Sequence, residues 1–205
     1  MKSRLVMAAL SVLAMLTVLP QAHAGGWTGC YVGAQGGYAV ASHEIGIAGL
    51  ASIDGISSEG FQGGPVIGCD LEVSDRFVFG AFADYAFRSV DTDISLFGGS
   101  ASVGLEDAWS VGARAGYLVT PQTLVYALVS YQRSDVNDAG TGLLPSDVDG
   151  FGGGAGIETG LAPGWSLRGE YRYVAYDGVN IGPVSIDTDE HQVRAGLVWR
   201  PWNAN

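Results

Sequence analysis

The chain has 205 residues, of which 32 are glycine and 47% are hydrophobic, and its formal net charge is −11. The acidic balance argues against a nucleic-acid partner, because binding the phosphate backbone requires a basic surface. The length suits a single domain, the absence of a Gly-x-y period excludes collagen, and the apolar content argues against disorder.

The first 24 residues are typical of a signal peptide. Lys2 and Arg4 precede an apolar run, residues 5–19, and Ala22-His23-Ala24 has the small-x-small pattern of a cleavage site. A membrane anchor is the weaker alternative, because the run is shorter than the ~20 residues that a spanning helix needs. We therefore expect a signal peptide at 1–24 and one domain at 25–205. Without Lys2 and Arg4, the mature chain has 8 basic and 21 acidic residues, a net charge of −13.

Eight later segments alternate apolar and polar residues with a period of two, which predicts β-strands. They cover residues 27–40, 59–73, 76–88, 105–119, 123–133, 148–161, 165–176 and 188–200. Connections after the second, fourth and sixth segments are short and rich in turn-forming residues. The other connections are long and rich in Gly, Ser and Asp, and they cover residues 41–58, 89–104, 134–147 and 177–187.

This sorting of connections indicates an outer-membrane barrel, which has short periplasmic turns and long external loops. No apolar stretch after residue 24 is long enough for a spanning helix, but a closed barrel can cross a bilayer because closure pairs its backbone groups. The sequence therefore predicts an all-β fold, an eight-stranded antiparallel up-and-down transmembrane β-barrel of a Gram-negative outer membrane. The even strand count leaves both mature termini in the periplasm.

The alternation also assigns faces. A barrel in lipid turns its charges inward, since an arginine at the bilayer midplane costs ~2–4 kcal/mol. The predicted lipid-facing aromatic residues are Trp109, Tyr117, Trp165, Tyr171, Tyr173 and Trp199. The register of 123–133 stays open, because two sets of apolar residues compete for one face. The sets are Leu124, Tyr126 and Leu128 against Val125, Ala127 and Val129.

Charged residues on the opposite faces form a predicted ionic network in the lumen. Its members are Asp70, Glu72, Asp84, Arg114, Glu158, Arg168, Glu170, Arg172 and Arg194. The interior of an eight-stranded barrel is just wide enough for side chains to fill, and buried charges must be paired. We interpret the network as a plug. The alternative is a narrow ion path lined by the same residues.

Four motifs resemble a known family. They are WTGCYVG at 27–33, GARAGY at 112–117, WSLRGEYRY at 165–173 and HQVRAGL at 191–197. They are similar to motifs of the small outer-membrane immunogenic proteins of alphaproteobacteria, which are classed with porin-family barrels. The resemblance covers nearly the whole mature chain. It implies an eight-stranded, surface-exposed envelope protein rather than an enzyme, and some relatives bind haemin.

The resemblance also implies partners: outer-membrane lipids, lipopolysaccharide and the barrel-assembly machinery, which recognises a terminal aromatic residue in relatives. Here Pro201 cannot donate a ladder hydrogen bond, so we expect the last strand to end near Arg200 and assembly to be less efficient. Host or surface ligands are not identified by the sequence.

Cys30 and Cys69 occupy positions where relatives carry aromatic residues. They lie at the start of the first segment and near the end of the second, on the predicted lipid face of antiparallel neighbours. Because the periplasm is oxidising, we predict a cross-strand disulfide. A register error of two residues would place the sulfurs out of bonding range and leave two free thiols.

The predicted function is a structural and surface-interaction role in the cell envelope. The first alternative is transport, through a narrow pore or by haemin uptake, with His43, His191 and the loop tyrosines as candidate ligands. The second is an outer-membrane lipid-modifying enzyme, with Ser42 beside His43 and Glu190 beside His191. We expect no enzyme, because nothing in the sequence orients a Ser–His–acid set.

We also expect no cofactor and no metal. Acidic residues such as Asp91, Asp93, Asp187 and Asp189 gather in the predicted loops. Hard cations prefer carboxylate ligands, but this spacing matches no calcium loop. A solvated acidic surface is the favoured interpretation.

Overall fold

The computed structural model describes residues 26–47, 50–89, 92–96, 99–137, 147–181 and 184–201. The predicted signal peptide lies outside these residues. Nearly all of the described chain is β-strand. No helix among the described residues is long and apolar enough to cross a membrane. The strands are β1 Gly29–Ile47, β2 Leu50–Ser74, β3 Phe77–Ser89, β4 Thr92–Leu96, β5 Gly99–Thr120, β6 Thr123–Asn137, β7 Asp147–Ala162, β8 Trp165–Ile181 and β9 Val184–Trp199.

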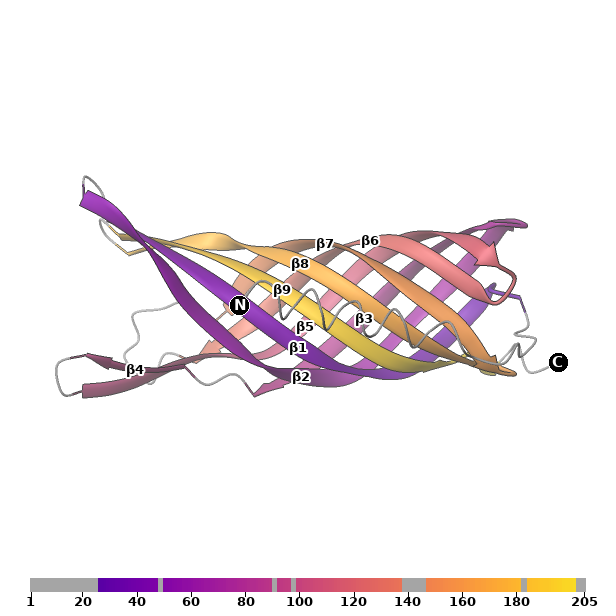
Figure 1. Cartoon of the computed structure of the whole chain (residues 1–205), viewed down its shortest axis with the longest axis horizontal. Coiled ribbons are helices and arrows are strands. Elements are labelled where there is room, and N and C mark those ends of the chain that lie inside the picture. The colour runs from indigo at the N-terminus through magenta and orange to yellow at the C-terminus, as the bar shows by residue number, and fades with distance from the viewer. Residues whose placement is uncertain are drawn as a thin grey trace.

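The strands form one closed antiparallel barrel (Figure 1). Neighbours pair in the order β3-β2-β1-β9-β8-β7-β6-β5, and a further pairing of β3 with β5 closes the ring. Eight strands take part in closure, whereas β4 pairs only with the start of β5. The predicted fold, an eight-stranded antiparallel barrel, is confirmed.

The strands are longer than the sequence predicts. Residues 41–58 were expected to form a loop, but β1 continues to Ile47 and β2 begins at Leu50. Residues 89–104 were also expected to form a loop, yet β4 and the first residues of β5 make a hairpin there. The prediction was wrong because Gly, Ser and Asp lower strand propensity, while an adjacent antiparallel partner continues the hydrogen-bond ladder. Figure 1 shows these hairpins projecting from one end of the barrel.

The opposite end carries three tight turns, at Asp75–Arg76, Pro121–Gln122 and Pro163–Gly164. Gly164 has a φ of +75°. A type II turn requires positive φ at its second central position, which glycine adopts easily, and proline is common at the position before it. We call this end of the barrel the turn end and the other the hairpin end.

Both described chain termini lie at the turn end. The indole N–H of Trp27 donates to the carbonyl of Pro121 at 3.2 Å. The last strand, β9, ends at Trp199, and the N–H of Arg200 donates to the carbonyl of Gly164 at 2.7 Å. The next residue, Pro201, has no N–H to continue a ladder. The predicted end of the last strand is therefore confirmed.

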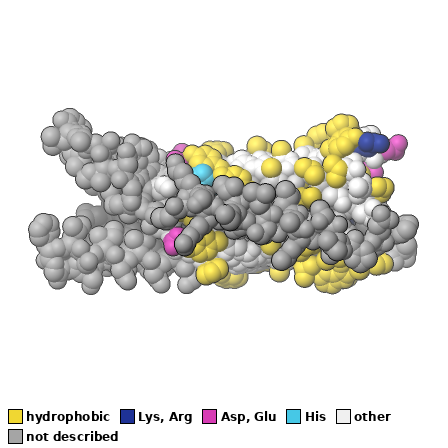
Figure 2. Space-filling view, viewed as in Figure 1, with side chains coloured by type: hydrophobic (Ala, Val, Ile, Leu, Met, Phe, Trp, Pro, Cys, Tyr) yellow, Lys and Arg dark blue, Asp and Glu magenta, His cyan; other side chains and the backbone are white. Residues whose placement is uncertain are grey.

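The barrel wall is apolar outside and polar inside. Figure 2 shows hydrophobic side chains gathered over the outer surface. The structure settles the register of β6, which the sequence left open. Leu124, Tyr126 and Leu128 are buried in the lumen, whereas Val129 is 65% exposed on the outer surface. The Tyr126 hydroxyl donates to Glu170 at 2.9 Å, so inward placement gives this phenol a buried partner.

The two cysteines face each other across β1 and β2. Cys30 and Cys69 are register partners, both are exposed on the outer surface, and a disulfide joins them. The described residues include no free cysteine. The bond ties the first strand to the second at the turn end, across 39 residues of sequence.

We predict that replacing both cysteines, Cys30→Ser with Cys69→Ser, lowers the free energy of unfolding by up to ~4 kcal/mol, because the unfolded chain regains the entropy of the closed loop. Urea unfolding of detergent-folded protein measures the loss. Wild type unfolded under reducing conditions is the matched control and is expected to behave like the double variant. Alkylation of two cysteines in unreduced wild type, detected by mass spectrometry, would contradict the disulfide.

Candidate functional site

The lumen contains the largest concentration of charge among the described residues. Period-two strands bring every second side chain inward, and in this chain many of those side chains are arginines and carboxylates. They form three clusters in succession from the turn end to the hairpin end. Because little solvent reaches them, each charge depends on its neighbours for compensation.

Glu158 of β7 is the centre of the turn-end cluster. This fully buried carboxylate accepts hydrogen bonds from Arg114 at 2.9 Å, Arg168 at 2.9 Å and Arg200 at 2.6 Å. Asp70 of β2 accepts from Arg114 at 2.5 Å and from Arg200 at 2.9 Å. Two carboxylates thus hold three guanidinium groups that come from different sides of the barrel.

Aromatic rings separate these guanidinium groups. Arg114, Arg168 and Arg200 lie 5.0, 4.8 and 5.1 Å from the centroid of the Tyr31 ring. Arg200 also lies 4.8 Å from the ring of Trp27. The negative faces of aromatic rings attract cations. The rings therefore compensate the cluster's excess positive charge and cover its opening at the turn end.

The middle cluster joins β3, β8 and β9. Asp84 accepts from Arg172 at 3.1 Å and from Arg194 at 2.9 Å. Glu170 accepts from Arg172 at 2.7 Å. Arg172 is 1% exposed and also donates to Ser110 at 3.0 Å. Its guanidinium is thus bonded on several sides.

The hairpin-end cluster contains one ion pair within a polar network. Arg88 of β3 lies 3.2 Å from Glu190 of β9. The Tyr176 hydroxyl donates to Glu190 at 2.6 Å and accepts from Gln132 at 2.5 Å. Ser134 lies 3.1 Å from the same hydroxyl. The uncharged side chains of Tyr176, Gln132 and Ser134 therefore link this ion pair to β8 and β6.

The structure brings eight of the nine predicted network residues together. They are Asp70, Asp84, Arg114, Glu158, Arg168, Glu170, Arg172 and Arg194. Glu72 is placed differently, because it is half-buried near the mouth of the turn end. It accepts the backbone N–H of Trp27 at 3.3 Å, and its own N–H donates to Thr28 at 3.0 Å. It anchors the start of the barrel domain.

Sequence reasoning left Arg88, Glu190 and Arg200 out of the network. The alternation itself could have found Arg88, which is four residues from Asp84, and Glu190, which is four residues from Arg194. The sequence predicts that the last segment begins at residue 188, which places Glu190 near its end. Since β9 begins at Val184, Glu190 lies well inside the strand.

The predicted lipid-facing aromatic residues all lie on the outer surface. These residues are between 38% and 45% exposed, and they are Trp109, Tyr117, Trp165, Tyr171, Tyr173 and Trp199. Trp165 and Trp199 stack at the turn end, with ring centroids 6.1 Å apart. In the first turn, Arg76 donates to the Tyr117 hydroxyl at 2.7 Å, and this hydrogen bond raises the pKa of Arg76.

His191 lies outside the lumen. Its Nδ1 lies 2.7 Å from the Tyr171 hydroxyl, and its ring packs against Tyr173. Glu190 points into the lumen, so the sheet separates these neighbours and they do not form a Ser–His–acid set. The side chains of His43, Asp91, Asp93 and Asp187 lie outside the described part. Among the described residues, no group of His, Cys, Asp and Glu could hold a metal ion.

We predict that Glu158→Gln lowers the free energy of unfolding by ~3–5 kcal/mol, because buried Arg168 then loses its ion pair while Arg114 and Arg200 keep only Asp70. Urea unfolding of detergent-folded protein measures this. Asp149→Asn is the control, since Asp149 pairs with Arg133 on the exposed rim and such pairs contribute ~0–1 kcal/mol. An equal loss of unfolding free energy in both variants would show that the buried Glu158 carboxylate contributes no more to stability than the exposed Asp149 carboxylate.

Comparisons with known proteins agree with this architecture. A family model for the outer membrane protein beta-barrel domain matches residues 8–200. The 31 kDa outer-membrane immunogenic proteins of Brucella melitensis and Brucella suis are each 28% identical over 200 residues, covering 85% of this chain and 83% of theirs.

Among solved structures, Neisserial surface protein A aligns with a TM-score of 0.50 and 21% identity, covering 84% of this chain and 97% of that one. This likeness supports the fold alone. The family match extends over most of the chain and includes the strands that carry the arginine clusters. The chain is therefore a Gram-negative outer-membrane protein that belongs to the outer membrane protein beta-barrel domain family.

Proposed function

We propose that this barrel has a structural and surface-interaction role in the cell envelope, that its lumen is closed, and that it is not an enzyme. The observation that carries the proposal is the way the ion pairs cross the interior. Arg114 of β5 binds Asp70 of β2 and Glu158 of β7. A single side chain thus connects three parts of the wall.

Ion pairs at other levels of the barrel also cross the interior, and they support a closed lumen. Arg194 of β9 binds Asp84 of β3, and Arg88 of β3 binds Glu190 of β9. A solute moving along the lumen would have to separate buried charges at three successive levels. Breaking a buried ion pair is costly because each charge loses its compensation. The interior of an eight-stranded barrel also has little width to spare.

The two ends suggest how the barrel is oriented. We place the turn end, with both ends of the mature chain, in the periplasm and the hairpin end outside the cell, as barrels of this class are arranged. Cleavage after Ala24 would leave Trp27 close to the new N-terminus. Its partners would then be outer-membrane lipids and lipopolysaccharide around the wall, and the barrel-assembly machinery during insertion.

The projecting hairpins support the surface role. Strands β1, β2, β4 and β5 project from the barrel at the hairpin end (Figure 1). The Brucella relatives are named immunogenic outer-membrane proteins, which agrees with a surface that other molecules can reach. We propose that the hairpins present this surface and that the packed barrel only supports them.

We predict that the purified protein, inserted into planar bilayers, gives no conductance steps above background, because we expect the buried ion pairs to block a continuous water path. Arg133→Gln, a change on the outer rim, is expected to be equally silent. Arg172→Gln removes a central guanidinium and is the informative variant. Steps in wild type whose size changes in Arg172→Gln would identify a conducting lumen and favour the pore alternative.

A further inference from the structure

Two arginines cross the lumen side by side in opposite directions. Arg88 starts on β3 and reaches Glu190 on β9, at 3.2 Å, while Arg194 starts on β9 and reaches Asp84 on β3, at 2.9 Å. Strands β2 and β1 lie between β3 and β9 in the sheet. The four charged groups therefore frame the inner surface of the β1–β2 wall.

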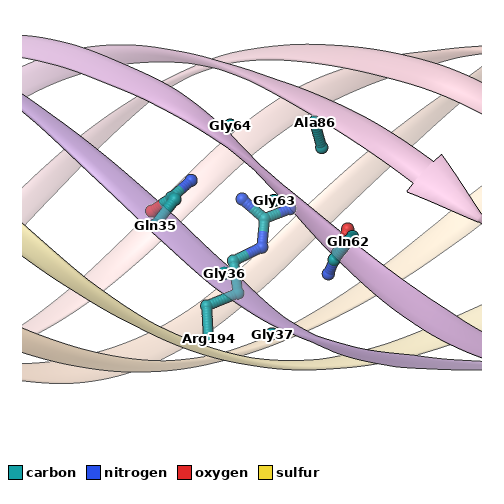
Figure 3. A pocket seen from close by; sticks show the side chains of 8 residues that line it. All are labelled: Gln35, Gly36, Gly37, Gln62, Gly63, Gly64, Ala86 and Arg194. Atoms are coloured by element: carbon teal, nitrogen blue, oxygen red, sulfur yellow. The ribbon is translucent and has the colours of Figure 1, made fainter.

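The wall inside this frame carries few side chains. Arg88 is the register partner of Gln62, Gln62 of Gly37, and Gly37 of Arg194. The four residues thus lie on one rung of the ladder, and Gly37 contributes no side chain. Figure 3 shows Arg194 extending over this glycine-rich wall, with Gln35 and Gln62 on either side.

Several polar atoms in the frame have no hydrogen-bond partner among the described residues. They are Nε and Nη2 of Arg88, Nε of Arg194, and Nε2 and Oε1 of Gln62. These side chains are almost fully enclosed, since Gln62 is 5% exposed, Arg194 is 4% exposed and the Arg88 side chain is 0% exposed. Buried polar groups in proteins are nearly always paired. The unpaired atoms therefore indicate that a ligand binds within this frame.

The unpaired atoms indicate what kind of occupant fits. Four are N–H donors and one is an acceptor, so the site favours a species that only accepts hydrogen bonds. A water molecule must also place its own two protons. Nε and Nη2 form the side of the Arg88 guanidinium that binds anions with two parallel hydrogen bonds.

The charge balance points the same way. Six arginines are enclosed in the described lumen, namely Arg88, Arg114, Arg168, Arg172, Arg194 and Arg200, against five enclosed carboxylates, Asp70, Asp84, Glu158, Glu170 and Glu190. Glu72 remains half-exposed at the turn end. An enclosed cation without a counter-charge is costly.

Space limits the anion to a small one. The hollow beside Arg194 and Gln62 has about 160 Å³ of empty volume, but with the side chains as they stand it has no room for a water molecule. Entry thus requires one side chain to turn aside. The Gln62 amide, which no hydrogen bond holds, is free to do so. We propose that a small monovalent anion of the size of chloride binds among Arg88, Gln62 and Arg194.

A halide titration tests the proposal on detergent-folded protein. Urea unfolding is followed while chloride replaces gluconate at constant ionic strength. Above the dissociation constant, each tenfold rise in chloride is expected to raise the folding equilibrium constant about tenfold. Gln62→Leu keeps the side-chain volume but removes the amide, so it is expected to fold in gluconate and to lose much of this response. Arg133→Gln, on the outer rim, is expected to keep it.

Crystals grown in bromide give the direct test. An anomalous peak among Arg88, Gln62 and Arg194 that is lost in Gln62→Leu would establish the site. A missing peak in wild type, with only water at this position, would overturn the proposal. A chloride response of equal size in wild type and Gln62→Leu would overturn it as well. Neither result depends on whether the barrel conducts.

Discussion

The whole architecture depends on one constraint, which is that backbone N–H and C=O groups inside a bilayer have no water to bond with. In this chain the constraint is met by the pairing of β3 with β5, which joins the two edges of the sheet and closes the described strands into a ring. Closure also decides where side chains go. Within the bilayer, alternate residues must face either lipid or a narrow interior, and charged residues are stable only on the interior side.

The interior is then too small to hold those charges in water. The chain therefore has to compensate its arginines with side chains from other strands, and it does so at three levels. Glu158 and Asp70 serve three arginines at the turn end, with Tyr31 and Trp27 packed against them. The same pairs that neutralise the lumen also cross it, so the stability of the barrel and the proposed closure of its lumen would have a common physical cause.

The β1–β2 wall departs from this pattern. Elsewhere the lumen arginines are largely bonded, but Arg88 and Arg194 keep donors free above a strip that carries Gly37 and Gln62. Gly37 carries no side chain, and each of the two arginines extends past this strip to a carboxylate on another strand. An acceptor-only anion suits that environment better than another protein side chain, because this part of the wall offers few acceptors.

Period-two alternation, together with the sorting of short and long connections, was enough to predict the barrel class, the inward face of Arg114, Glu158 and Arg172, and the opposition of Cys30 and Cys69 on neighbouring strands. It could not show that β1, β2, β4 and β5 continue through Gly- and Ser-rich segments, because that depends on a paired neighbour. It also left the register of β6 open, and the tertiary structure decided it by placing Tyr126 in the lumen, where its hydroxyl donates to Glu170. Which carboxylate serves which arginine was decided by the tertiary structure, since only the stagger of a closed barrel brings residues such as Arg88 and Glu190 to the same level.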